Sequence, residues 1–221
     1  MLNPLGTMII LSIVFSQLFK SIESYPAYIL SGLIAWIFFA QTTNASMSGL
    51  VWGGSLLQRI YLPRTIFGVS AIGTGLVNLT LSIVPLVLVM LFTSTPIRLS
   101  IVFLPISILV LAGFALGFGL IISTIAVYFP DVAEMYQIIL TAWMYLTPII
   151  YPEEIIPKTL LSLIQHFNPM YSIIRLFRMP IYFGRFPTLE EFLPAFLWSS
   201  GILIVGWFFF TAKSDEFAYR I

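Results

Sequence analysis

Long apolar runs without charge divide this chain into segments. Six runs contain no Asp, Glu, Lys, Arg or His, at 2–19, 27–47, 66–93, 101–127, 135–151 and 192–211. A helix of about 20 apolar residues covers the ~30 Å hydrocarbon core of a bilayer. The runs are too long and too uniformly apolar for the alternating strands of a barrel. The pattern predicts an all-α integral membrane protein with six transmembrane helices.

The longest polar segment, 152–191, separates the fifth run from the sixth and contains five prolines and the single histidine. Within it, Ile155–Phe167 and Tyr171–Met179 are amphipathic, of helical length and bounded by proline. Such stretches usually lie in the membrane interface or dip partway into the bilayer. We therefore expect 1–221 to form a single transmembrane domain with a re-entrant helical segment at 152–191. With six spans, both termini share one side of the membrane and this segment lies on the other.

Composition agrees with a membrane protein and excludes several classes of function. The chain is 59% hydrophobic and 9% charged, with a mean hydropathy of +1.02, whereas a soluble domain has roughly 25% charged residues. A net charge of +1 excludes a broad nucleic-acid-binding face, and the absence of cysteine excludes disulfides and thiol nucleophiles. The first positive charge is Lys20, so 2–19 is interpreted as a retained span rather than a signal peptide.

Candidate chemistry in the chain is sparse. His166 is the only histidine, and Glu153 and Glu154 nearby show no metal-ligand spacing. We therefore expect neither a metal nor another cofactor. A proton-coupled secondary transporter needs ionisable groups at membrane depth, which the spans lack. An intramembrane enzyme would need converging carboxylates or histidine, for which only Asp131-x-x-Glu134 and the segment 152–191 offer candidates.

Small and aromatic residues each leave two interpretations open. Gly49-x-x-x-Gly53 and Gly113-x-x-x-Gly117 allow helices to approach closely, either within one bundle or at a dimer seam. The 20 Phe, 10 Tyr and 5 Trp exceed what interfacial belts require. They are either ordinary packing or the lining of a passage for sugars, whose apolar ring faces stack on aromatic rings. The candidates for that lining are Trp36, Phe39, Trp143, Tyr145 and Tyr151.

Five local strings occur in order along the chain. They are Tyr25-Pro26-x-Tyr28-x-Leu30-x-Gly32-x-x-x-Trp36-x-Phe38-Phe39, Arg59-x-Tyr61-Leu62-Pro63, Tyr128-Phe129-x-Asp131-Val132, Trp143-x-Tyr145-x-Thr147-Pro148-Ile149-Ile150-Tyr151 and Asn168-Pro169-Met170. Together with the spans they resemble the membrane permease of type-2 ABC exporters, in the branch that moves lipid-linked polysaccharide. O-antigen, capsule and wall teichoic acid are the cargoes of that branch. The resemblance covers essentially the whole chain.

The resemblance implies a homodimeric, multi-pass permease of the bacterial cytoplasmic (inner) membrane, with cytosolic termini. Two copies of a separate cytoplasmic ABC ATPase would be its partners, alongside membrane lipid and the lipid-linked polysaccharide. The chain itself has no glycine-rich phosphate loop. We therefore expect a transport subunit and not an enzyme, with ATP hydrolysis on the partner. The alternatives are a type-2 ABC permease for a drug, a lipid or haem and, after it, a secondary transporter.

The resemblance also implies roles for particular residues. The cytosolic loop and turn that meet the ATPase would contain Gln58, Arg59, Tyr61, Leu62, Pro63, Arg64, Asp131 and Glu134. The re-entrant segment would be external, near the channel exit, with a break between its helices at Asn168-Pro169. Its candidate residues are His166, Asn168, Pro169, Tyr171 and Arg175.

Two features depart from the family pattern. Members usually carry Arg before the aspartate of the cytosolic turn, whereas Pro130 precedes Asp131 here. Members also begin with an amphipathic, basic cytosolic helix that helps to form the cytosolic substrate gate. This chain starts at the family's Asn3-Pro4-Leu5 point, so the sequence is expected to lack that helix.

Overall fold

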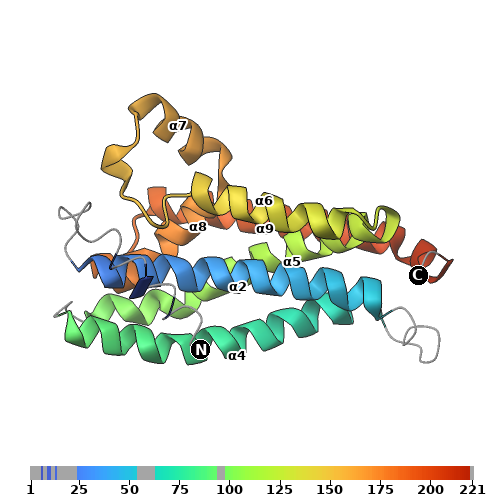
Figure 1. Ribbon diagram of the computed structural model, residues 1–221, viewed down its shortest axis with the longest axis horizontal. Helices are drawn as coiled ribbons and strands as arrows, with labels where there is room; N and C mark the ends of the chain where they lie inside the picture. Colours follow the sequence, from blue (N-terminus) through green and yellow to red (C-terminus); the bar gives the residue numbers. More distant parts are fainter. Residues whose placement is uncertain are drawn as a thin grey trace.

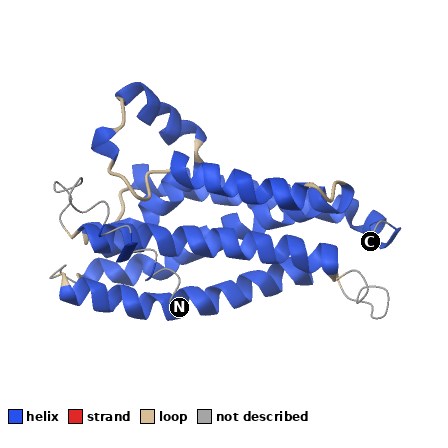
Figure 2. Ribbon diagram, in the orientation of Figure 1, coloured by secondary structure: helices blue, strands red, loops and turns tan. Residues whose placement is uncertain are grey.

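The computed structural model describes residues 24–53, 63–93 and 98–219, together with Gly6, Ile9, Ile10 and Ile13. All regular structure in this part of the chain is helical, as Figures 1 and 2 show. The long helices are α2 (Tyr25–Trp52), α4 (Ile66–Phe92), α5 (Leu104–Tyr128), α6 (Val132–Leu146) and α9 (Leu189–Lys213). The short elements are η1 (Leu99–Phe103), η2 (Glu153–Ile155), α7 (Lys158–Phe167), α8 (Pro169–Arg178), η3 (Met179–Phe183) and η4 (Ser214–Tyr219). The prediction of an all-α chain is confirmed for the described residues.

Four helical segments of the described chain are long and apolar enough to cross a membrane. They are Tyr25–Trp52, Ile66–Phe92, Leu99–Tyr128 and Leu189–Phe217. They contain or closely match the predicted spans 27–47, 66–93, 101–127 and 192–211. The run 2–19 lies outside the described residues, apart from Gly6, Ile9, Ile10 and Ile13. The count of six spans therefore stays a prediction.

The fifth predicted span, 135–151, differs from the helix that the structure contains. Helix α6 has 15 residues and ends at Leu146, a length of roughly 22 Å at 1.5 Å per residue, short of the ~30 Å core. Thr147 is extended, with φ −103° and ψ 131°. This is the conformation that the ring of the following proline, Pro148, imposes on its neighbour. Uncharged composition extends to Tyr151, but proline ends the helix five residues earlier.

Helix α2 forms the centre of the bundle. In its most apolar 18-residue stretch, 78% of the residues are buried, against 17% for α9. Helices α4, α5 and α8 pack around it, and α9 packs mainly along α5. The core contains the fully buried rings of Phe39, Phe114 and Phe177. In Figure 1 the long helices run along the same axis, while α7 stands clear of them at one end.

The two ends of the bundle carry different elements. The end with α7, α8 and the start of α2 is called the hairpin end below, and the end with Arg64, Tyr128–Glu134 and η4 is called the tail end (Figure 1). At the hairpin end, helix starts follow recognisable signals. Helix α9 begins with a reciprocal capping box between Thr188 and Glu191. Helix α8 begins with Asn168 as N-cap and Pro169 in its first turn.

Glycines let α5 and α9 approach closely. A methyl group on Gly117 would overlap the backbone of Ile202 and Leu203 in α9, and one on Gly206 would overlap the backbone of Gly117. A methyl group on Gly113 would lie within 2.9 Å of the Ser199 hydroxyl. The Gly113-x-x-x-Gly117 pair therefore packs against a helix of the same chain, as the first of its two interpretations expects.

Candidate functional site

Three of the five sequence strings meet at the hairpin end. The Tyr25 hydroxyl donates to the Ile150 carbonyl at 2.8 Å, and the Tyr28 hydroxyl lies 3.3 Å from the Tyr151 carbonyl. These bonds join the first turn of α2 to the irregular segment that follows α6, about 120 residues away in sequence. Two of the strings that carried the family resemblance are therefore joined by direct contacts, and the third is joined through Asn168, described below.

Arg178, at the end of α8, crosses the same junction. Its side chain is 4% exposed. It donates to the carbonyls of Pro148 at 2.8 Å, Ile149 at 2.7 Å and Tyr28 at 3.3 Å. Its guanidinium carbon lies 3.9 Å from the centre of the Tyr28 ring. All of its described acceptors are backbone oxygens, so neutral dipoles and a π face solvate a buried cation.

Gly32 makes room for Arg178 on α2. A methyl group at this position would overlap the guanidinium. The glycine of the first string therefore allows Arg178 to approach α2 closely. Gly32 belongs to the first sequence string, whereas Arg178 was not among the predicted site residues. The signal that could have indicated it was an arginine within the amphipathic stretch Tyr171–Met179 of a chain with few charges.

Asn168 fixes the corner between α7 and α8. Its side-chain oxygen accepts from the Trp143 indole at 2.8 Å and from the Met170 amide at 3.1 Å. Its side-chain nitrogen donates to the Thr147 hydroxyl at 2.9 Å. The predicted break at Asn168-Pro169 is present, since α7 ends at Phe167 and α8 begins at Pro169. One buried amide thus ties this corner to the end of α6.

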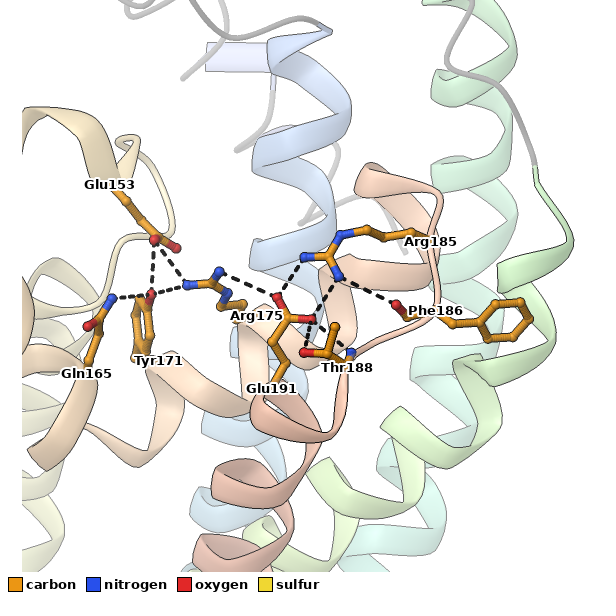
Figure 3. A network of polar contacts seen from close by, with 8 residues as sticks. All are labelled: Glu153, Gln165, Tyr171, Arg175, Arg185, Phe186, Thr188 and Glu191. Carbon is orange, nitrogen blue, oxygen red and sulfur yellow. Dashed lines mark hydrogen bonds and ion pairs between the residues drawn. The ribbon is translucent and has the colours of Figure 1, made fainter.

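A network of charged and polar side chains, shown in Figure 3, covers the outer side of this junction. The Tyr171 hydroxyl donates to Glu153 at 2.9 Å and accepts from Gln165 at 3.2 Å and from Arg175 at 2.7 Å. Arg175 also pairs with Glu153 at 3.4 Å. Tyr171 and Arg175, both predicted site residues, therefore hold η2 against α8 and α7.

The second half of the network joins α8 to the start of α9 (Figure 3). Glu191 receives two bonds from Arg185, at 2.6 and 2.8 Å, in a fork. Glu191 also accepts from the backbone and hydroxyl of Thr188 and pairs with Arg175 at 3.5 Å. Glu191, which in the sequence is only a charge next to the run 192–211, therefore connects α8 to α9.

The network favours the protonation states that maintain it. Burial raises the pKa of the Tyr171 phenol. Burial also lowers the pKa of Arg175, but Glu153 and Tyr171 raise it above its ordinary value. The bonds to Glu191 raise the pKa of Arg185. Tyr171 thus stays a donor and both arginines stay charged at neutral pH.

The predicted aromatic residues separate into two groups. The rings of Trp36 and Phe39 lie 6.1 and 5.4 Å from the Trp143 ring, and both side chains are buried, at 4% and 0% exposure. Tyr145 is 60% exposed, and the hydroxyl of the half-buried Tyr151 donates to its carbonyl at 2.7 Å. The structure therefore brings Trp36, Phe39 and Trp143 together and leaves Tyr145 outside. A role for these residues in lining a passage stays a prediction.

At the tail end, Arg64 contacts the C-terminal element η4. It donates to the Ser214 carbonyl and lies 3.6 Å from the Asp215 carboxylate. Tyr128 donates to Glu216 and packs edge-to-face on Phe217. The C-terminal element η4 therefore folds back onto Arg64, just before α4, and onto the end of α5.

The remaining predicted coupling residues are only partly described. Asp131 and Glu134 are exposed at the start of α6, and Pro63 precedes α4. Figure 1 shows the start of α6 at the same end of the bundle as the C-terminus. No contact between Arg64 and either carboxylate is found in the described chain. Gln58, Arg59, Tyr61 and Leu62 lie outside the described residues.

His166 does not join the network. It is exposed on α7, and its Nδ1 lies 2.7 Å from the Ser162 carbonyl. In the described part of the chain, no three His, Asp or Glu side chains converge as a metal site would require. The polar contacts of the hairpin end are hydrogen bonds and ion pairs that join helices. These contacts can transmit movement between α7 and α8 on one side and α2, α6 and α9 on the other, or resist it.

The chain is similar in sequence to known membrane transport proteins. The profile of the ABC-2 type transporter family matches residues 1–182. The O-antigen export system permease protein RfbA of Myxococcus xanthus is 28% identical over 224 residues, covering 100% of this chain and 85% of the relative. Proteins with the same description from Klebsiella pneumoniae are 25% identical over 221 residues, covering 98% and 83%, and 26% identical over 176 residues, covering 78% and 67%.

Proposed function

This chain belongs to the ABC-2 type transporter family, and on that premise we propose that it is the permease subunit of an ATP-driven exporter of lipid-linked polysaccharide. The observation that carries the proposal is similarity over the whole chain to proteins named as O-antigen export permeases. Strings spread over the sequence also meet at one junction, through Tyr25, Tyr28 and the 148–151 segment. O-antigen, capsule and teichoic acid share the relevant chemistry, a hydroxyl-rich glycan on a lipid anchor.

We place the partner ATPase at the tail end. The permease would be a homodimer in the bacterial inner membrane that binds two ATPase copies. Residues Gln58–Arg64 and the turn with Asp131 and Glu134 would receive the ATPase motion. Support comes from exposure of both carboxylates at that end and from the contact of Arg64 with η4. Because η4 is anchored on α5 through Tyr128, a push on this surface would reach several helices at once.

The hairpin end would then lie outside the cytoplasm. Residues 152–191 would form the re-entrant segment, and two further segments would complete six spans. These are the run 2–19 and α6 extended by the non-helical residues 147–151, since α6 alone is too short to cross. The amphipathic character of α7 supports an interfacial position, since its Leu160, Leu163 and Phe167 side chains are exposed. The bonds of Asn168 and Arg178 would carry movement of α6 and α2 to this segment.

Affinity isolation of the tagged permease from native membranes, followed by mass spectrometry, tests the assignment. We expect a stoichiometric ABC ATPase with the wild-type chain, and its loss in the Arg59→Glu/Arg64→Glu double variant. Arg98→Glu, which changes an exposed arginine at the hairpin end, is the matched control and should retain the ATPase. Isolation of the wild-type permease without any ATPase would contradict the exporter assignment. Equal loss in both variants would contradict the position of the coupling surface.

A further inference from the structure

Uncharged polar side chains of α2, α4 and α6 line two hollows on the bundle. Gln41 and Asn44 of α2 line a groove of about 440 Å³ together with Gln137 and Thr141 of α6. Gln41 also lines a second, smaller pocket with Thr74 and Asn78 of α4. The two hollows therefore adjoin at Gln41. A volume near 440 Å³ is within the roughly 300–1,000 Å³ of ligand pockets.

These residues lie close to the middle of their helices. Gln41 is about 2.5 residues from the midpoint of α2 (Tyr25–Trp52), or roughly 4 Å along its axis. Asn78 lies within about one residue of the midpoint of α4 (Ile66–Phe92). Helices that span a bilayer place such positions near the centre of the hydrocarbon, where an unbonded amide is strongly disfavoured.

Neighbouring surface at the same depth is apolar. Next to Gln137 on α6, Ile138 is 72% exposed and Ile139 is 50% exposed. On α4, Val77 is 60% exposed beside Asn78. The four polar side chains thus share the groove with the apolar Trp36, Ala40, Leu140 and Met144, while the adjoining surface at Ile138, Ile139 and Val77 is apolar. This division is expected when one face meets lipid and the other meets water or a polar partner.

The hydrogen-bonding capacity of the groove is only partly used. Gln137 donates to the Asn44 side chain at 2.6 Å, and Asn44 donates to the Ala40 carbonyl at 2.8 Å. Among the described residues, the amide of Gln41 has no hydrogen-bond partner. Each side-chain amide offers both donors and acceptors, and the lining residues of both hollows include no charged side chain. The groove therefore suits a neutral ligand whose groups both donate and accept.

We propose that Gln41, Asn44, Gln137 and Thr141 form the mid-membrane contact surface for the sugar hydroxyls of the exported glycan. This inference rests on the proposed function. Hydroxyl groups are neutral and both donate and accept, which matches the remaining hydrogen-bonding capacity of these side-chain amides better than an anionic group does. Trp36 lines the same groove but is only 4% exposed. Phe39 is fully buried, so amides provide most of the direct contact rather than the aromatic core.

Single cysteine variants test this surface, because the chain contains no cysteine of its own. The variants are Gln41→Cys, Gln137→Cys and, as a matched control one residue away, Ile138→Cys. Cells expressing each permease with its ATPase are treated with a small, charged methanethiosulfonate, and modification is followed by mass spectrometry. We expect modification at positions 41 and 137 but not at position 138. When the cells also synthesise lipid-linked polysaccharide, modification should slow by about twofold at half occupancy of the groove.

Three results would overturn the proposal. They are equal reactivity at all three positions, unchanged rates with and without polysaccharide, and a disulfide between two copies through the cysteine at position 41 or 137. Co-isolation of the ATPase with each variant, measured on the same membranes, separates this test from that of the proposed function. Retained ATPase with the wrong reactivity pattern rejects the groove alone, whereas wild-type permease without ATPase rejects the exporter assignment.

Discussion

Replacing Arg178 tests whether the buried junction at the hairpin end stabilises the fold. Arg178→Met removes the cation and keeps an unbranched side chain of useful length. The change leaves the carbonyls of Pro148 and Ile149 without their bonds of 2.8 and 2.7 Å. A buried acceptor without a partner costs about 1–3 kcal/mol. Two such acceptors would together cost about 2–6 kcal/mol. Pro148 keeps a longer contact of 3.4 Å from the Tyr28 hydroxyl, so we expect the lower half of that range, about 2–4 kcal/mol.

That loss converts to a measurable shift in melting temperature. For a chain of this size, 1 kcal/mol corresponds to about 2–4 °C, so a loss near the middle of that range, about 3 kcal/mol, should lower the apparent melting temperature in detergent by roughly 6–12 °C. Arg175→Met is the matched control, one turn earlier on α8. The Arg175 side chain is 35% exposed and its ion pairs are 3.4 and 3.5 Å long. Pairs of that kind contribute about 1 kcal/mol or less, so its shift should be several degrees smaller.

Arg178→Lys separates the charge from the geometry. Lysine keeps a cation at the site but lacks the planar fork that reaches three carbonyls at once. A desolvated ammonium with fewer bonds should be at least as destabilising as methionine. A lysine variant as stable as wild type, or a methionine variant no worse than Arg175→Met, would refute the account of this junction.

Three further changes have expected outcomes in the same melting assay. Asn168→Ala removes the acceptor of the Trp143 indole and of the helix cap, and should cost about 2 kcal/mol. Asn168→Asp keeps both acceptors and should cost less, so equal losses would contradict the assigned bonds. Gly117→Ala should cost about 1–3 kcal/mol by pushing α9 away from α5, whereas Gly201→Ala, which meets open space, should be neutral or stabilise by up to about 1 kcal/mol. Glu191→Gln should cost about 1–2 kcal/mol, and a loss larger than that of Arg178→Met would contradict the ranking of the two contacts.

The sequence predicted helix positions well where charged residues flank an apolar run on both sides. The segments 66–93 and 192–211 differ from α4 and α9 by at most three residues at either end. The segment 135–151 failed at its end because composition ignores the conformational effect of Pro148 on Thr147. The break at Asn168-Pro169 succeeded because a cap residue before proline is a local signal.

The side-chain contacts were harder to predict because they depend on pairing between distant helices. Nothing local marks Arg178 as buried, since its acceptors belong to segments roughly 30 and 150 residues away. Gln41 and Gln137 were passed over because the analysis searched the spans for charges, and amides do not interrupt an uncharged run. The family strings indicated which segments matter, but not that they meet through backbone carbonyls.

Export of polysaccharide by cells that lack their own permease tests the central claim most directly. The permease is expressed with its ATPase, either active or unable to hydrolyse ATP, and glycan on the cell surface is measured beside lipid-linked glycan retained inside. The account predicts surface polysaccharide only when the permease and the active ATPase are both present. Retention of lipid-linked polysaccharide inside the cell, despite an assembled complex with active ATPase, would contradict it.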